Sequence, residues 1–144
     1  MNVLDGVPGR RILLASWATD AVFILSATPV ALGAESLEIV AATVAITLFG
    51  ISLVVWSVAF AGAIVRSARG DDVVVANLFF LQGSAPRRVQ YHLFGALGLG
   101  LVVVAATAWK APFGVLVPML PLGLIGLWGA RHGRFPPRAR RTDA

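Results

Sequence analysis

Four long apolar stretches, separated by short polar connections, dominate the pattern of hydrophobic and polar positions along the chain. They cover about residues 12–32, 37–65, 92–109 and 113–130. A helix of about 20 apolar residues crosses the roughly 30 Å hydrocarbon layer of a bilayer. The pattern therefore predicts an all-α, polytopic membrane protein with four transmembrane helices, organised as a single membrane domain over residues 1–144.

None of the four stretches alternates between apolar and polar residues, and this favours helices over the strands of a membrane barrel. The second stretch is longer than a bilayer crossing requires, so we expect its helix to tilt or to project. Lys110 and Pro112 join the third and fourth stretches, which predicts a tight helical hairpin. Pro118 and Pro121 should bend the fourth helix because proline lacks a backbone N–H.

Composition agrees with lipid as the solvent, since 58% of the residues are hydrophobic, 13% are charged and mean hydropathy is +0.83. A water-soluble domain of this size could not hide so many apolar residues in one core. The absence of cysteine excludes disulfides, thiolate catalysis and cysteine-ligated metals. The segment GRRILLAS superficially resembles a twin-arginine leader. However, the apolar stretch exceeds the usual signal core of about 7–15 residues, so we expect it to stay uncleaved.

Arginine is confined to alternate connections between the apolar stretches. It precedes the first stretch at Arg10 and Arg11, recurs in the loop 66–91, and fills the tail 131–144. The other connections carry Glu35, Glu38 and Lys110. By the positive-inside rule, the two termini and the loop 66–91 are predicted to be cytoplasmic.

Asp20 is a carboxylic acid inside the first apolar stretch, about 12 Å into the predicted bilayer at 1.5 Å per residue. It shares a helical face with Ser16 and Thr19 through spacings of three and four residues. We expect Trp56 and Ser57 of the second helix to reach a similar depth and to donate hydrogen bonds to it. No cation is expected at that level, so a mostly neutral acid is predicted. An interhelical hydrogen bond is the favoured interpretation, and a proton relay or ion pathway is the alternative.

The loop 66–91 contains an apolar segment, residues 73–81, that is too short to cross a bilayer. It is predicted to be interfacial, to dip into the membrane, or to pack in a groove of the bundle. Asp71 and Asp72 are expected to cap its start as a helix. As an alternative, these two acids could hold a divalent cation and the loop arginines could bind a phosphate-bearing substrate: Arg66, Arg69, Arg87 and Arg88. Two adjacent acids are a weak metal motif, and the spaced Asp motifs of membrane CDP-alcohol transferases are missing, so no metal site is predicted.

The tail RHGRFPPRARRTDA should be extended because of Pro136 and Pro137. Its arginines are predicted to contact anionic lipid headgroups: Arg131, Arg134, Arg138, Arg140 and Arg141. No stacking aromatic residues accompany them, so nucleic acid is not an expected partner.

Two pairs of small residues have a spacing of four, Ala96 with Gly100 and Gly126 with Ala130. GALGLG (residues 95–100) superficially looks like a nucleotide-binding loop, but it lies within a predicted span. Small residues at this spacing let membrane helices approach closely, and we therefore predict helix packing here.

The segments LVPMLPLGLIGLWGARHGRFPPR (residues 116–138) and FFLQGSAPRRV (residues 79–89) resemble small four-helix integral membrane proteins of actinobacteria with uncharacterised function. The resemblance covers about half of the chain. It implies a location in the bacterial inner membrane and no particular activity.

The sequence thus favours a non-enzymatic accessory or scaffold subunit of an inner-membrane assembly, without cofactors, whose partners are lipid, other membrane proteins or further copies of itself. A small transporter or ion-conducting oligomer using Asp20 is the alternative. An enzyme acting on lipid phosphate through the loop 66–91 is less favoured.

Overall fold

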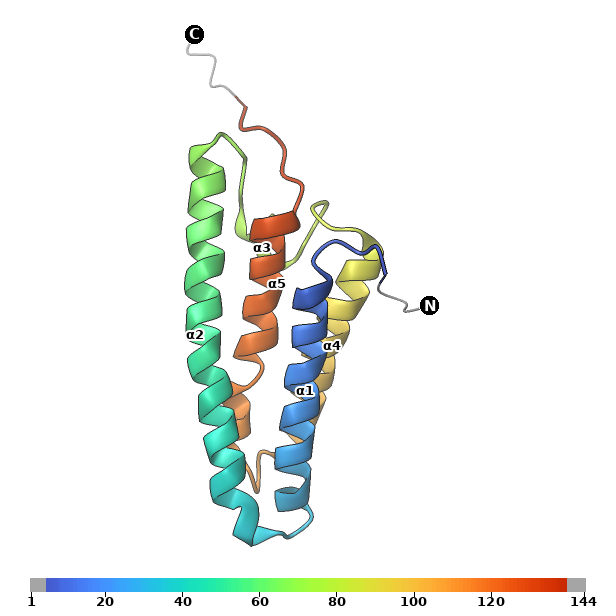
Figure 1. Ribbon diagram of the computed structural model, residues 1–144, viewed down its shortest axis with the longest axis vertical. Helices are drawn as coiled ribbons and strands as arrows, with labels where there is room; N and C mark the ends of the chain where they lie inside the picture. The colour runs from blue at the N-terminus through green and yellow to red at the C-terminus, as the bar shows by residue number, and fades with distance from the viewer. Residues whose placement is uncertain (1–4, 140–144) are drawn as a thin grey trace.

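The computed structural model describes residues 5–139, and within them the regular structure is helical. The elements, with η marking a 3₁₀ helix, are α1 (Arg10–Ala31), η1 (Glu35–Leu37), α2 (Glu38–Ala68), α3 (Val75–Phe79), α4 (Arg87–Thr107), η2 (Pro112–Leu116) and α5 (Met119–His132). Figure 1 shows α1, α2, α4 and α5 running along the long axis of the molecule. Four segments are long and apolar enough to span a membrane, so this part of the prediction is confirmed.

The two ends of the bundle differ in charge. α1 and α4 begin at the end where α2 and α5 finish (Figure 1). The arginines of the described residues lie in the terminal turns of these helices or in the segments next to them. We call this end the arginine end. The opposite end holds Glu35 and Glu38 at the α1–α2 turn, and Lys110 between α4 and η2. Among the described residues, arginine is therefore confined to one end of the bundle.

The predicted fourth helix is two elements instead of one bent helix. η2 ends at Leu116 and α5 begins at Met119, with Pro118 as its N-cap. Pro118 and Pro121 lack an N–H, but the first turn of a helix leaves its N–H groups without a partner in the helix. Both prolines fall at or within this first turn, and the expected bend is therefore a break.

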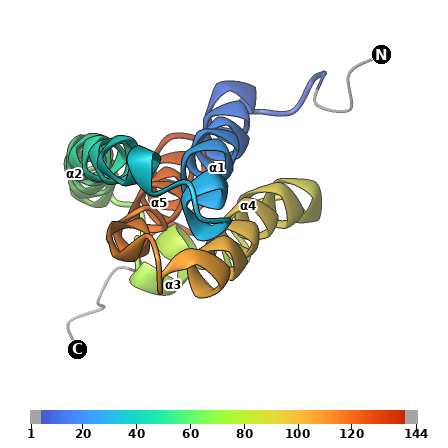
Figure 2. The ribbon, with the colours of Figure 1, turned by 90° about the horizontal axis from the view of Figure 1, so that it is seen from below.

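α5 lies at the centre of the bundle, between the other helices (Figure 2). Nine of its 14 residues are buried. α2, in contrast, buries five of its 31 residues, all of them small: Ala41, Ala45, Ser52, Ala59 and Ala63. Small residues allow the two helices to approach closely, and a Cβ added at Gly62 of α2 would lie 3.2 Å from the Cβ of Ala130.

The start of α1 is fastened to α5. The side chain of Trp128 is 1% exposed, and its Nε1 donates a hydrogen bond of 2.9 Å to the carbonyl of Pro8. Gly9 follows with φ +72°, in the left-handed region that favours glycine, and an added Cβ would collide with the Trp128 ring. The absence of a side chain at residue 9 lets the chain pass over the indole.

The short helix α3 packs in the bundle against α5 and α2. Phe79 is 8% exposed and stacks on Trp56 of α2, with ring centroids 4.9 Å apart. An added Cβ at Gly126 of α5 would overlap the Phe79 ring, and one at Gly129 would meet the carbonyl of Leu78. Of the three predicted placements for residues 73–81, packing against the bundle is the one that the structure shows.

The prediction that Asp71 and Asp72 cap this helix is wrong. Its N-cap is Val74, with no side-chain hydrogen bond to the first turn. The carboxyl group of Asp71 pairs instead with Arg66, at 2.8 Å. α3 begins too far along the chain to be capped by these acids, because the residues that connect them to α3 are extended.

Gly126→Ala is expected to lower the free energy of unfolding by about 1–3 kcal/mol, because the added methyl group must displace Phe79. Gly98→Ala is the matched control, since that helical glycine has open space around it. Alanine favours helices over glycine, so the control should gain up to about 1 kcal/mol. Thermal unfolding of the detergent-solubilised protein measures both, and equal gains would contradict the packing of α3.

Candidate functional site

Asp20 lies at the middle of α1, about 15 Å from the helix ends at 1.5 Å per residue. Its side chain is 1% exposed. One apolar cluster, which includes Leu13 and Trp128, lies toward the arginine end, and another, which includes Phe23, lies toward the opposite end. The carboxyl group therefore sits in a layer between two apolar clusters.

The polar face predicted around Asp20 is buried as a unit. Ser16 is 0% exposed and Thr19 is 6% exposed. The hydroxyl of Thr19 donates to the carbonyl of Ala15 at 2.9 Å. Neither carboxyl oxygen of Asp20, nor the Ser16 hydroxyl, has a hydrogen-bond partner within the described residues. Leaving polar atoms without hydrogen bonds is costly in an apolar interior. Asp20 is therefore the buried polar residue whose presence most needs an explanation.

The predicted hydrogen bonds from Trp56 and Ser57 to Asp20 are wrong. Trp56 donates its Nε1 to the carbonyl of Met119, at 2.9 Å, and exposed Ser57 donates to the carbonyl of Leu53. The prediction placed Trp56 and Asp20 at the same depth in the bundle, which the helix bounds do not support. Asp20 is as far from the end of α1 as Phe49 is from the start of α2, so Trp56 lies nearer the arginine end.

Asp20 faces α4 through the gap left by a glycine. A Cβ at Gly100 would lie 3.1 Å from its Oδ1. Ala96, one turn earlier, is fully buried. The sequence marked Gly100 for helix packing but did not connect it with Asp20. The connection could have been found because α1 and α4 start at the same end, and both residues lie near the helix midpoints.

The second pair of small residues, Gly126 and Ala130, is buried on α5. Gly126 lies against Phe79 of α3, and Ala130 lies against Gly62 of α2. The two pairs thus occupy separate contacts, one between α1 and α4 and one between α5 and its neighbours.

Arg66, at the end of α2, holds the arginine end together. Its guanidinium group pairs with Asp71 and donates to the carbonyl of Gly133, at 2.7 Å, and more weakly to that of Ala130. It also lies over the ring of Phe135, 4.6 Å from the centroid. A cation at the end of a helix satisfies free carbonyl groups and the helix dipole. Arg66 therefore ties α2 to the end of α5.

Residues 133–139 of the tail run extended, as predicted, but along the segment between residues 70 and 84. Asp71 and Pro137 form an isolated antiparallel bridge, and the backbone N–H of Arg138 donates to the carbonyl of Gly70 at 2.7 Å. The side chains predicted to contact lipid are exposed at Arg131, Arg134 and Arg138. Arg140 and Arg141 lie outside the described residues.

The acids of the loop do not assemble a metal site. No group of three or more histidine, cysteine or acidic side chains within residues 5–139 is arranged to hold a metal ion. The carboxyl group of Asp71 forms an ion pair with Arg66, and the backbone N–H of Asp72 donates to the carbonyl of Pro136 at 2.8 Å. The two acids therefore belong to the attachment of the tail.

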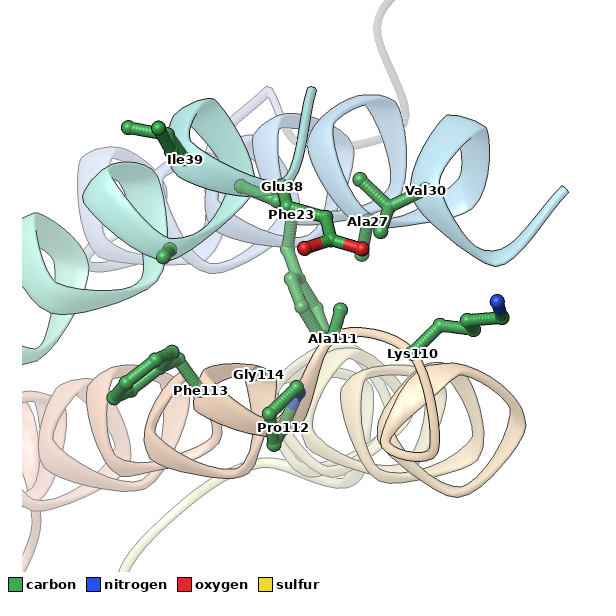
Figure 3. A pocket seen from close by; sticks show the side chains of 12 residues that line it. Phe23, Ala27, Val30, Glu38, Ile39, Lys110, Ala111, Pro112, Phe113 and Gly114 are labelled. Carbon is green, nitrogen blue, oxygen red and sulfur yellow. The ribbon is translucent and has the colours of Figure 1, made fainter. Parts of the chain in front are cut away.

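Two hollows lie at opposite ends of the bundle, and the sequence predicted neither. A cavity of about 260 Å³ opens between α1, α2 and η2, where Phe23 reaches across to Gly114 and the Glu38 carboxyl group points inward (Figure 3). An open groove of about 720 Å³ lies between α2 and the end of α5, and it is lined by Arg66, Arg69 and Arg131 among others. Both are formed by residues distant in sequence.

Comparisons with models of protein families, with curated proteins and with solved structures find no match. The resemblance to small actinobacterial membrane proteins therefore stays a prediction.

Asp20→Leu is expected to raise the free energy of unfolding by about 1–3 kcal/mol in detergent, because it replaces an acid without a partner by an apolar side chain of the same branched shape. The control is Ser57→Leu on the exposed side of α2, which should change stability by less than about 0.5 kcal/mol. A loss of stability in Asp20→Leu would show that the carboxyl group has a stabilising partner after all.

Proposed function

We propose that this chain is a non-enzymatic accessory or scaffold subunit of a bacterial inner-membrane assembly, and that α2 binds a membrane-spanning helix of its partner. The supporting observation is the one-sided packing of α2. Only five of its 31 residues are buried, although it is the most hydropathic of the four candidate spans. A helix that buries so few of its residues in its own bundle has most of its surface available for contact with lipid or protein.

The exposed side of α2 carries residues typical of helix contacts. Thr43, Thr47, Gly50 and Ser57 are exposed and follow spacings of four, three and seven, so they form one stripe opposite the buried alanines. We call it the outer face of α2. The three hydroxyl groups donate to carbonyls of their own helix, and they can still accept hydrogen bonds. Small and hydroxyl-bearing residues are enriched where membrane helices meet, and Gly50 has open space around it.

The proposal includes four membrane crossings with both chain termini in the cytoplasm. It is supported by the collection of arginines at one end of the bundle, since positively charged residues are retained on the cytoplasmic side. α2 has a length of about 46 Å at 1.5 Å per residue, more than the roughly 30 Å of hydrocarbon. It would therefore extend beyond the hydrocarbon layer unless it tilts.

Single cysteines test the orientation cleanly because the chain contains none of its own. In intact spheroplasts, a membrane-impermeant maleimide should label Ser36→Cys, at the α1–α2 turn. It should label Ala68→Cys and Ala139→Cys only after the membrane is permeabilised. Labelling of positions 68 and 139 from opposite sides would refute the four-crossing arrangement.

A photo-reactive residue at Val54, which is 64% exposed on the outer face of α2, tests the partner contact. It should form a defined protein–protein cross-link, and Thr47→Leu with Gly50→Leu should reduce its yield at least about tenfold by separating the helices. The matched control is Ala105→Leu with Ala106→Leu on exposed positions of α4, which should leave the yield unchanged. Cross-links to lipid alone would contradict the subunit proposal, and the mass of the product distinguishes a second copy from another protein.

A second candidate, a small transporter or ion-conducting oligomer, is supported by the buried and unpaired carboxyl group of Asp20. Intramembrane acids are often parts of proton or ion pathways. Proteoliposomes should then show proton or cation flux that Asp20→Asn reduces at least about tenfold. Flux that is absent, or that is unchanged by Asp20→Asn, would remove this candidate and leave the subunit proposal untouched.

A further inference from the structure

We propose that the groove between α2 and the end of α5 binds one anionic phospholipid. Its phosphate would lie between Arg69 and Arg131, and one acyl chain would run along α2. The inference rests on the proposed membrane insertion but is independent of the partner helix.

The groove combines a charged rim with an apolar wall. Arg66, Arg69 and Arg131 line it at the arginine end, and below them the wall is formed by Val58, Ala61, Gly62 and Val65 of α2 together with Ala130 of α5. Val58 precedes Val65 by two helical turns, or about 10 Å. A hollow of about 720 Å³ that is charged at the rim and apolar along the wall matches an amphiphile. The headgroup would lie at the rim and the hydrocarbon chain along the wall.

The arginines at the rim differ in what they already bind. Arg66 is engaged by Asp71, at 2.8 Å, and by carbonyl groups at the end of α5, so the negative charge of Asp71 is matched within the fold. Arg69 and Arg131 are exposed and make no hydrogen bond or ion pair with other described residues. Guanidinium groups suit phosphate because they present several N–H donors in a plane. Two such groups on either side of the groove provide charge complementarity for an anionic headgroup.

The shape of the rim is fixed by contacts that do not involve a ligand. Arg66 joins α2 to the carbonyl of Gly133, and Arg138 donates to the carbonyl of Gly70 and the hydroxyl of Ser67. The helix ends that carry Arg69 and Arg131 are therefore held at a set separation. Little ordering of the backbone is needed on binding, which favours affinity.

The apolar wall distinguishes a lipid from other anions. A free phosphate ion would use the rim alone, whereas a phospholipid would also bury its chain against Val58 and Val65. This arrangement continues into the region where the bilayer is expected, because the groove opens along the exposed side of α2. Cytoplasmic leaflets are rich in anionic lipid, and basic residues next to a span are attracted to it.

Native mass spectrometry of the purified protein with phosphatidylglycerol tests the site, with phosphatidylcholine of the same chains and glycerol 3-phosphate as comparisons. We expect one phosphatidylglycerol to bind in preference to both. Arg69→Gln with Arg131→Gln should weaken its binding about thirtyfold, since each arginine near an anionic headgroup contributes about fivefold. The matched control is Arg87→Gln with Arg134→Gln, which removes equal charge from exposed positions at the same end but outside the groove.

Each result decides the proposal. Equal weakening by both arginine pairs would show diffuse attraction to the basic surface and would overturn it. Glycerol 3-phosphate binding as tightly as the lipid would also overturn it, by showing a phosphate site only. Val58→Trp should fill the wall and weaken lipid binding at least about tenfold, and unchanged binding would refute the acyl-chain position. Thr47→Leu with Gly50→Leu should leave lipid binding intact, so failure of the partner proposal and failure of this one can be told apart.

Discussion

The close approach of other elements to α5 is the constraint on which the rest of the fold depends. Because α5 presents glycine where its neighbours meet it, Trp56 of α2 packs against Gly123 and Phe79 of α3 packs against Gly126. Larger side chains at these positions would push both neighbours outward. Arg66 reaches the carbonyl groups at the end of α5 only because α2 lies so near. The attachment of the loop and tail near Arg66, and the groove beside them, thus depend on the glycines of α5.

The sequence predicts the number and kind of helices because run length and hydropathy are local properties. It also predicts the burial of Asp20, since an acid within an apolar span is driven toward the bundle interior. It could not identify the neighbour of Asp20, because that depends on which helix faces α1, and the answer is α4 through Gly100. From the sequence, Arg66 could be interpreted only as a charge that sets the membrane topology or as a possible phosphate ligand. Its bonds to Asp71 and Gly133 depend on how the tail returns across the bundle.

Buried apolar side chains separate the carboxyl group of Asp20 from the charged groups at the arginine end. Between Asp20 and the arginine end lies a cluster that includes Leu13, Ile125 and Trp128, each at most 1% exposed. Transfer of a proton or ion from Asp20 to that end would require this cluster to part, because closely packed protein interiors hold few voids as large as a water molecule. A scaffold role requires no such movement. This contrast is the physical reason for ranking the subunit proposal above the transporter.

The hydrogen bond from Trp128 to Pro8 has a consequence for how the chain reaches its final form. It joins a residue that precedes α1 to α5, which follows the other described helices along the chain. While the ribosome is still making α5, the first helix has no anchor at its start, and α2 and α3 lack the surface that they share. Final assembly of this bundle must therefore wait until α5 has left the ribosome, because a nascent chain released before that point would leave α1, α2 and α3 without the helix against which they all pack.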